Sequence, residues 1–184
     1  MRIPLSVAGV LFLLYPALRP WHDETTMSGA SAAMGSTAWV VAHVCAMLGF
    51  ILVAIALLEI DRRAAIIFWI GAGLTLPYYG AEDFGLHAIA AQPNLLDLAD
   101  AVRYNPVSIT MFGLGLLTMA AAAIVVAVRL KTVPAIVFAV GFGLFLPQFF
   151  APPAVRIVHG VLLAAGCVWL ASNPKRVRAA LSPA

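Results

Sequence analysis

The chain has 184 residues, of which 63% are hydrophobic and only 10% are charged. With a mean hydropathy of +1.00, a chain of this size cannot bury its apolar residues in a soluble core, because small domains have too much surface. The formal charge of +3 does not indicate nucleic-acid binding, because the basic residues lie in short segments between apolar runs. We therefore expect an integral membrane protein whose solvent is the lipid bilayer.

Six apolar runs predict six membrane-spanning helices in a single all-α domain, residues 1–184. A helix that crosses the hydrocarbon core needs about 20 residues, and local thinning of the bilayer accommodates shorter ones. The first run follows Arg2 and also fits the start of a cleaved signal peptide, so its retention in every context stays open. The predicted spans cover residues 3–18, 38–60, 64–91, 106–128, 133–150 and 153–171.

The segment between the third and fourth spans contains a further predicted helix. Asn94 is a candidate N-cap for residues 95–104, in which one face is apolar and the opposite face carries two aspartates and Arg103. This pattern is typical of a short helix that lies on the membrane surface. We therefore expect an interfacial helix in the second outer loop, whereas the first outer segment, residues 19–37, is expected to be a polar loop with small residues.

The charges at the two ends of the predicted bundle are unequal. One end carries eight basic and two acidic residues, namely Arg2, Arg62, Arg63, Arg129, Lys131, Lys175, Arg176, Arg178, Glu59 and Asp61. The other end carries three basic and six acidic residues, namely Arg19, Arg103, Arg156, Asp23, Glu24, Glu82, Asp83, Asp97 and Asp100. By the positive-inside rule, both termini are predicted to be cytoplasmic and the acidic loops to face outside the plasma membrane.

A phrase of the third span returns in the fifth without a gap. This internal repeat predicts an architecture of three hairpins, each with an outgoing helix that reaches a proline, an outer loop and a returning helix. Parallel repeats often place a binding site where the units meet, although glycines that let helices approach closely would also explain the likeness. The matching residues are Gly71, Gly73, Leu74, Leu76, Pro77 and Ala81 in the first copy and Gly141, Gly143, Leu144, Leu146, Pro147 and Ala151 in the second.

Polar residues from several predicted spans share one depth. At about 1.5 Å of rise per residue, they lie roughly 20 to 28 Å above the cytoplasmic surface of a core about 30 Å thick. Ionisable groups at such depth are unfavourable unless paired or hydrated, so their clustering favours an outward-opening functional site. The candidate site residues are His43, Tyr78, Tyr79, Glu82, Asp83, His87, Gln148, Phe149, Arg156 and His159.

Several of these residues have a purely structural alternative. A histidine on an apolar helix face is often a hydrogen bonder between helices, and this alternative applies to His43 and His159. Arg156 most simply forms an ion pair with Glu82 or Asp83, which would stabilise the bundle without any catalytic role. The functional and structural interpretations therefore predict different partners for the same side chains.

One functional interpretation is an acid-base enzyme that takes a lipophilic substrate from the outer leaflet. A carboxyl group in apolar surroundings can donate a proton, so Glu82 or Asp83 is the candidate acid, with Arg156 and His159 polarising an oxygen. Aromatic side chains such as Tyr78 would line the pocket and stabilise a developing cation. These features fit proton-initiated cyclisation or isomerisation of an isoprenoid-like molecule.

In whole-chain character the sequence resembles uncharacterised small multipass bacterial membrane proteins, and that resemblance implies no activity. In its size and its buried acidic residues it is also similar, at the level of fold, to small integral-membrane terpene cyclases. This second resemblance implies a cyclase or isomerase that uses a buried carboxylic acid.

Two further interpretations remain. In a non-catalytic binder of haem, quinone or a metal ion, His43 and His159 could ligate a haem iron, and His22, Asp83 and His87 could hold a divalent ion. In the other interpretation the chain is a transporter or a small scaffold subunit. Against transport, no path of polar residues continues through the cytoplasmic half of the predicted bundle. We predict no cofactor, no bound metal and no nucleic-acid partner, because the familiar phosphate, zinc and nucleophile motifs are missing from the sequence. The expected partners are the lipid bilayer and a lipophilic small molecule.

Overall fold

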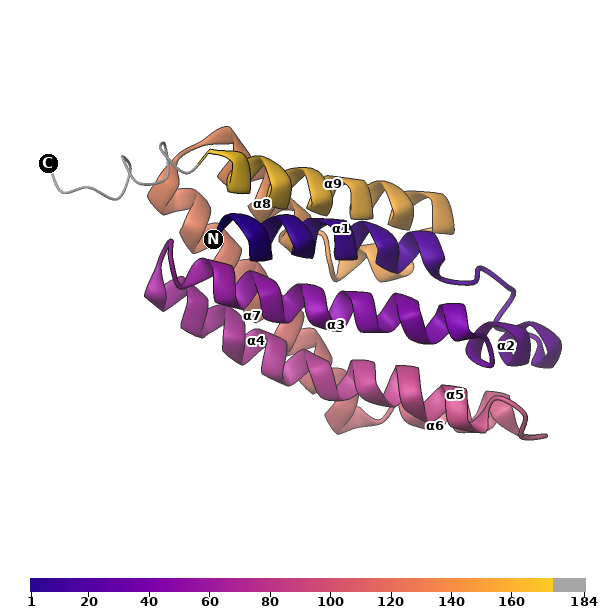
Figure 1. Ribbon diagram of the computed structural model, residues 1–184. Helices are drawn as coiled ribbons and strands as arrows, with labels where there is room; N and C mark the ends of the chain where they lie inside the picture. The colour runs from indigo at the N-terminus through magenta and orange to yellow at the C-terminus, as the bar shows by residue number, and fades with distance from the viewer. Residues whose placement is uncertain (174–184) are drawn as a thin grey trace, which may run out of the picture.

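The computed structural model describes residues 1–173, and over this range it contains helices and no strands (Figure 1). The described elements are α1 (Arg2–Leu18), α2 (Met27–Met34), α3 (Thr37–Leu57), α4 (Arg62–Gly80), the π-helix η1 (Ala81–Gly85), α5 (Leu86–Ile89), α6 (Leu95–Arg103), α7 (Pro106–Leu130), α8 (Val133–Gly143), the 3-10 helix η2 (Pro147–Phe150) and α9 (Pro153–Ser172). The all-helical class predicted from composition is confirmed.

Four helical segments of the described chain are long and apolar enough to cross a membrane. They are Thr37–Leu57, Arg62–Ile89, Pro106–Leu130 and Pro153–Ser172. Two further apolar helices, α1 and α8, are shorter. The protein is therefore a helical membrane protein, as its hydropathy indicated.

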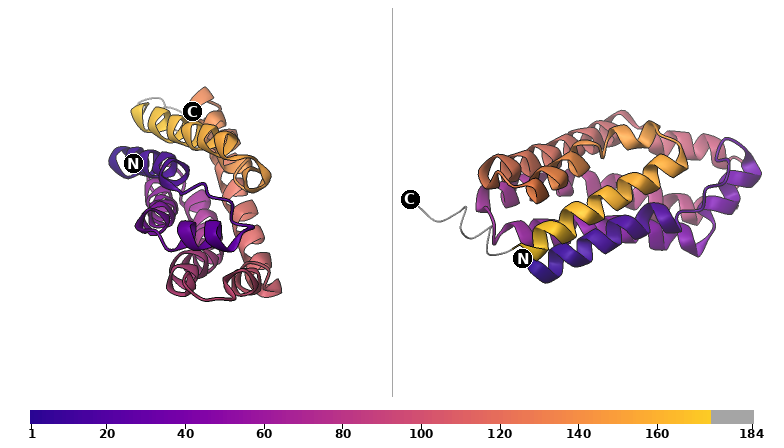
Figure 2. Two further views of the ribbon diagram at one scale, coloured as in Figure 1. Left: turned by 90° about the vertical axis from the view of Figure 1, so that its right-hand side faces the viewer. Right: turned by 90° about the horizontal axis from the view of Figure 1, so that it is seen from above.

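The long helices of residues 1–173 form a closed ring (Figure 2). Around this ring the order is α1, α3, α4, α7, α8 and α9, and α9 packs back against α1. Phenylalanines fill the interior, where the rings of Phe12 and Phe50 lie 5.2 Å apart and those of Phe68 and Phe142 lie 5.0 Å apart, measured between centroids. Aromatic packing thus holds together helices that are far apart in sequence.

One end of the ring consists of short turns and the start of α1 (Figure 1). Asp61 caps α4 by accepting a hydrogen bond from the Ala64 backbone N–H at 2.9 Å, and it also forms an ion pair with Arg129 in the last turn of α7. The amino group of Met1 pairs with Glu59. These contacts tie the α3–α4 turn to α1 and α7.

The opposite end carries α2, α5 and α6, which form a second small core with the start of α3 (Figure 1). The predicted polar loop over residues 19–37 was wrong for α2. Thr26 caps this helix by accepting a hydrogen bond from the Gly29 backbone N–H, and its alanines and Met34 pack against the buried Trp39. Ala30 and Ala33 are therefore buried contact residues of a helix.

The α4 helix continues through η1 into α5, so the helical segment covers 28 residues, Arg62–Ile89. At about 1.5 Å per residue this is roughly 42 Å, longer than the hydrocarbon core. Pro77 lies inside α4, and the π-helical turn follows four residues later. A π-turn changes the direction of the side chains within it and is common at functional sites. Glu82 and Asp83 lie in this turn.

The α8 helix ends at Gly143 and does not run to residue 150 as expected. Pro147 cannot donate a hydrogen bond to the Gly143 carbonyl, and residues 147–150 form the separate helix η2. Because α4 continues past the equivalent Pro77, the proline alone does not end the helix. Pro152 and Pro153 follow directly, and they force Ala151 into an extended conformation with ψ of 154°. The third and fifth apolar runs therefore differ in structure within the shared phrase, from Leu144 onward.

Candidate functional site

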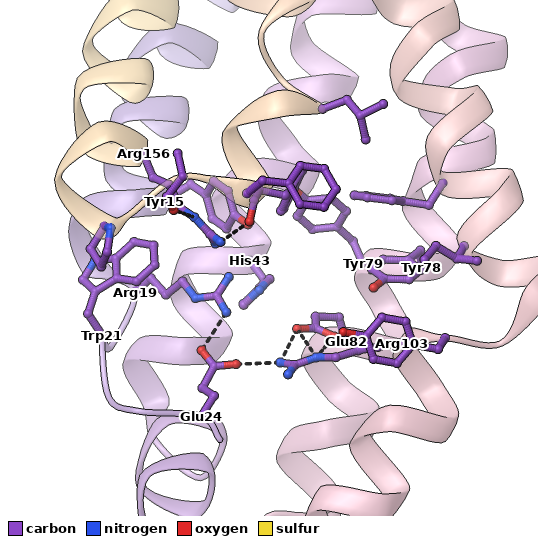
Figure 3. Close-up of a pocket in the computed structure, with 18 of the residues that line it drawn as sticks. Tyr15, Arg19, Trp21, Glu24, His43, Tyr78, Tyr79, Glu82, Arg103 and Arg156 are labelled. Atoms are coloured by element: carbon purple, nitrogen blue, oxygen red, sulfur yellow. Dashed lines mark hydrogen bonds and ion pairs between the residues drawn. The ribbon is translucent and has the colours of Figure 1, made fainter. Parts of the chain in front are cut away.

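A cavity of about 770 Å³ opens among the helices near α2 and α6 (Figure 3). It lies where α8 has ended and only η2 and the start of α9 close the ring. The lining residues are Tyr15, Arg19, Trp21, His22, Asp23, Glu24, Thr25, His43, Tyr78, Tyr79, Glu82, Arg103, Tyr104, Ile109, Phe112, Gly113, Leu146, Phe149, Phe150, Ala151, Pro153 and Arg156.

A chain of ion pairs crosses one side of the cavity (Figure 3). Arg19 Nη2 lies 2.8 Å from Glu24 Oε1, and Glu24 Oε2 lies 2.7 Å from Arg103 Nη2. Arg103 also donates to Glu82, from Nε at 3.1 and 3.0 Å to Oε1 and Oε2 and from Nη2 at 2.7 Å to Oε1. The chain joins the end of α1, the segment before α2, the end of α6 and η1.

The ion-pair chain is held in its charged form. Burial alone would raise the pKa of Glu24, but the guanidinium groups of Arg19 and Arg103 lower it below its usual value. Burial likewise opposes the charge on Arg103, but its hydrogen bonds and its attraction to Glu82 raise the pKa of Arg103 above its usual value. Two arginines and two glutamates therefore balance one another at neutral pH.

Arg156 does not form the expected ion pair with Glu82 or Asp83. Its Nε donates to the Ala151 carbonyl oxygen at 3.0 Å, and its Nη2 donates to the Phe149 carbonyl oxygen. Its guanidinium carbon lies 5.4 Å from the centroid of the Trp21 ring. Within residues 1–173, no carboxylate lies within ion-pair distance of Arg156. The prediction was wrong because Arg103 of α6 occupies the place beside Glu82.

His43 and Tyr79 form a polar part of the inner wall. His43 Nδ1 lies 2.8 Å from the Trp39 carbonyl oxygen, so Nδ1–H donates and Nε2 is an acceptor in the neutral ring. The rings of His43 and Tyr79 are 6.0 Å apart between centroids. The Tyr79 hydroxyl is buried and has no hydrogen-bond partner in the described part of the chain. The wall therefore holds a hydrogen-bond acceptor and a hydroxyl without a described partner on two neighbouring rings.

The remaining wall is aromatic and aliphatic. Tyr78 stacks on Phe112 with ring centroids 4.3 Å apart, and Phe112 contacts Phe149 edge to face at 5.3 Å. Ile109 and Gly113 of α7 and Leu146 extend this surface. Such a wall suits the apolar body of a ligand, with few polar groups to fix its orientation.

Six of the ten predicted site residues line the cavity, and the other four do not. His43, Tyr78, Tyr79, Glu82, Phe149 and Arg156 line it. Asp83 and Gln148 are buried outside the cavity lining. His87 and His159 also lie outside it: His87 Nδ1–H donates to the Met34 carbonyl at 2.7 Å, and His159 Nε2–H donates to the Gly141 carbonyl at 2.8 Å. A shared depth was the reason for predicting most of these residues, but depth does not specify which way a side chain points.

Sequence reasoning missed four charged residues of the site, Arg19, Asp23, Glu24 and Arg103. Arg103 lay on the polar face of the predicted interfacial helix, where a charged residue usually faces water. The available signal was the presence of both signs of charge in the segments around Arg19, Glu24 and Arg103 of a chain with few charges. Opposite charges in segments at the same end of a bundle predict an ion pair between them.

The geometry gives no support to haem or metal binding. His159 does not line the cavity, and its Nε2–H is already donated to a carbonyl, so the two histidines do not face a common haem site. Among the described residues no group of three or more His, Cys, Asp and Glu side chains is placed to hold a metal ion.

Comparisons of this chain with protein-family models, with curated proteins and with solved structures give no match. The site is therefore interpreted from its own geometry.

Proposed function

We propose that the chain crosses the plasma membrane six times as three hairpins, α1 with α3, α4 with α7, and α8 with α9. The pairwise packing of these helices and their order in the ring support this topology. The excess of basic residues at the end with the short turns supports cytoplasmic termini and a cavity that faces outside. In this arrangement α6 lies at the outer membrane surface, where its apolar face contacts α2 and its charged face supplies Arg103.

Within this membrane protein, the cavity binds a lipophilic molecule with a polar head. The observation that carries the proposal is the combination of a cavity of about 770 Å³ with an aromatic wall on one side and a chain of ion pairs on the other. The apolar body packs against Tyr78 and Phe112, and the head lies toward the charged side. Entry from the outer leaflet follows from the level of the cavity and from exposed Phe150 and Tyr104 at its edge.

The second candidate is an acid-base enzyme that cyclises or isomerises an isoprenoid-like substrate in the same cavity. His43 and Tyr79 favour it, because both line the cavity with ring centroids 6.0 Å apart, and one can accept and the other donate a proton. Glu82 already accepts three hydrogen bonds from Arg103, so its oxygens are occupied by a protein partner. The likeness to small integral-membrane terpene cyclases therefore depends on His43 and Tyr79 rather than on the two acids.

Two glycines provide a matched test of lipophilic binding. A Cβ added at Gly113 or at Gly143 would meet no described atom within 4 Å, but only Gly113 lines the cavity. We expect mass analysis of purified protein to find a lipophilic molecule retained by the wild type and by Gly143→Phe, and lost from Gly113→Phe. Equal retention by all three proteins, or no retained molecule in the wild type, would contradict the proposal.

Turnover is separated from binding by a second pair of variants. If the chain is an enzyme, His43→Gln and Tyr79→Phe retain the bound molecule but accumulate it unconverted, and the wild type carries the product. If the same molecule is recovered from the wild type and from both variants, the enzyme candidate is rejected and the binding function remains.

A further inference from the structure

We propose that the head group held in this cavity is an anion, a carboxylate or a phosphate carried by a lipid, and that Arg156 binds it. This inference rests on the proposed lipophilic binding and adds the chemical class of the ligand. Arg156 lies on the cavity wall opposite Tyr78, beside Tyr15 and Trp21 (Figure 3).

The first support is the charge distribution around the cavity. Arg19 and Arg103 are balanced by Glu24 and Glu82 through the ion-pair chain. The remaining acid of the lining, Asp23, is exposed, and its carboxylate accepts hydrogen bonds from the backbone and the hydroxyl of Thr25. Arg156 is thus the lining cation that no described carboxylate neutralises. An anionic ligand would complete the balance.

The second support is the donor geometry at Arg156. A guanidinium group carries five N–H donors, and two donations, to the carbonyls of Phe149 and Ala151, fix its plane. The other donors are left for a ligand in a side chain whose position is already set. Arg156 also lies in the first turn of α9, a helix of 20 residues, whose amino end carries partial positive charge.

The third support comes from buried donors elsewhere in the cavity lining. The Tyr79 hydroxyl and the Arg19 Nε–H are both buried, and neither has a partner among residues 1–173. Tyr79 is only 2% exposed. Buried donors without acceptors are unfavourable, and the oxygens of a carboxylate or phosphate would supply acceptors. A neutral head group would leave the charge of Arg156 unmatched.

The inference is tested by fluorescence quenching in lipid nanodiscs at pH 8. The probes are three dibrominated C18 lipids that share one chain and differ in the head, a carboxylate, a phosphate monoester and an alcohol. Bromine quenches tryptophan at short range, and Trp21 lies on the cavity wall. Gly113→Phe supplies the background for probe that only dissolves in the bilayer.

We expect wild-type protein to bind both anionic probes at least tenfold more tightly than the alcohol. Arg156→Gln should weaken the anionic probes by about tenfold to a hundredfold, as expected for a charge-assisted hydrogen bond, and leave the alcohol unchanged. Arg156→Lys keeps the charge and should retain most of the preference, which separates charge from the packing of η2. Arg62→Gln, an exposed arginine at the other end of the bundle, should behave as the wild type.

The outcomes separate this inference from the proposed function. If the wild type binds the alcohol as tightly as the anions, and Gly113→Phe abolishes both, lipophilic binding stands and the anionic head group is overturned. If no probe quenches beyond the Gly113→Phe background, the lipophilic site itself is overturned. If inorganic phosphate displaces the lipid anions at comparable concentration, the ligand of Arg156 is a soluble anion and the lipid assignment is overturned.

Discussion

Two adjacent carboxylates in η1, Glu82 and Asp83, lie in opposite environments. Glu82 accepts three hydrogen bonds from Arg103. Asp83 is fully buried, and neither of its oxygens has a partner in the part of the chain that the structure describes. A buried carboxylate without partners, such as Asp83, lowers the stability of the fold. Breaking a buried ion pair, such as that of Glu82 with Arg103, lowers stability because it leaves a charge with fewer partners.

The same isosteric change should therefore have opposite effects at the two positions. Glu82→Gln removes one of the two carboxylate partners of the half-buried Arg103 and leaves only Glu24, so it should lower the free energy of unfolding by about 2 kcal/mol. Asp83→Asn removes a buried carboxylate that accepts no described hydrogen bond, and it should leave stability equal or higher. Thermal unfolding in one detergent compares the two variants with the wild type. A larger loss for Asp83→Asn than for Glu82→Gln would show that Asp83 has a partner that the described contacts lack.

The ion-pair chain also predicts how stability responds to acid. Because the folded-state pKa of Glu24 is lowered from its usual value of 4.5, this group stabilises the protein above pH 4.5. That contribution is lost as the pH falls through the lower, folded-state value. The difference in melting temperature between wild type and Glu24→Gln should be constant from pH 7 to about pH 5 and shrink below about pH 4.5.

A control for this titration is Asp97→Asn on the exposed face of α6. Its melting temperature should follow that of the wild type at every pH, because no described ion pair includes Asp97. A Glu24→Gln difference that persists unchanged to pH 3 would show that the contribution of Glu24 does not depend on its charge.

At the scale of elements, the two glycines that open the repeated phrase have similar surroundings in both copies. A Cβ at Gly71 would lie 2.7 Å from the Gly115 carbonyl oxygen of α7, and one at Gly141 would lie 2.9 Å from Leu163 of α9. At Gly73 and Gly143 an added Cβ would meet no described atom within 4 Å. The first glycine of each copy therefore allows the outgoing helix to approach its returning partner.

This packing predicts a contrast within α4. Gly71→Ala places a methyl group against the backbone of α7 and should lower the free energy of unfolding by about 1 to 3 kcal/mol. Gly73→Ala makes the same chemical change two residues away in open space, and it should be neutral or slightly stabilising. Equilibrium unfolding of both variants measures the difference. Equal effects would mean that α4 and α7 do not pack at Gly71.

The sequence predicted elements better than their contacts. Apolar runs located the helices that contain His43, Tyr79 and His159, because hydropathy and spacing are local properties. They did not predict that α8 ends at Gly143 and leaves room for a cavity. The same phrase with Pro77 lies in α4, which does not end there, so the proline gave no signal. Nor could they predict that Arg103 turns toward Glu82, since that pairing depends on how α6 folds over the bundle.

At the scale of the whole molecule, the proposed topology places the two ends of the bundle on opposite sides of the membrane. With Cys45 and Cys167 replaced by serine, single cysteines at Lys131→Cys and Asp97→Cys report on the two ends. A membrane-impermeant thiol reagent applied to intact cells should label Asp97→Cys and leave Lys131→Cys unlabelled until the cells are opened. The reverse pattern would mean that the cavity faces the cytoplasm.

The central claim is that the cavity between η1, α7, η2 and α9 holds a lipophilic molecule with its head toward Arg156. An experimental density map of the protein extracted in native nanodiscs tests it most directly. The claim predicts elongated density that contacts Tyr78 and Phe112 and ends within hydrogen-bond distance of Arg156. A map in which side chains close the cavity, or in which only separate water-sized peaks occupy it, would contradict the claim.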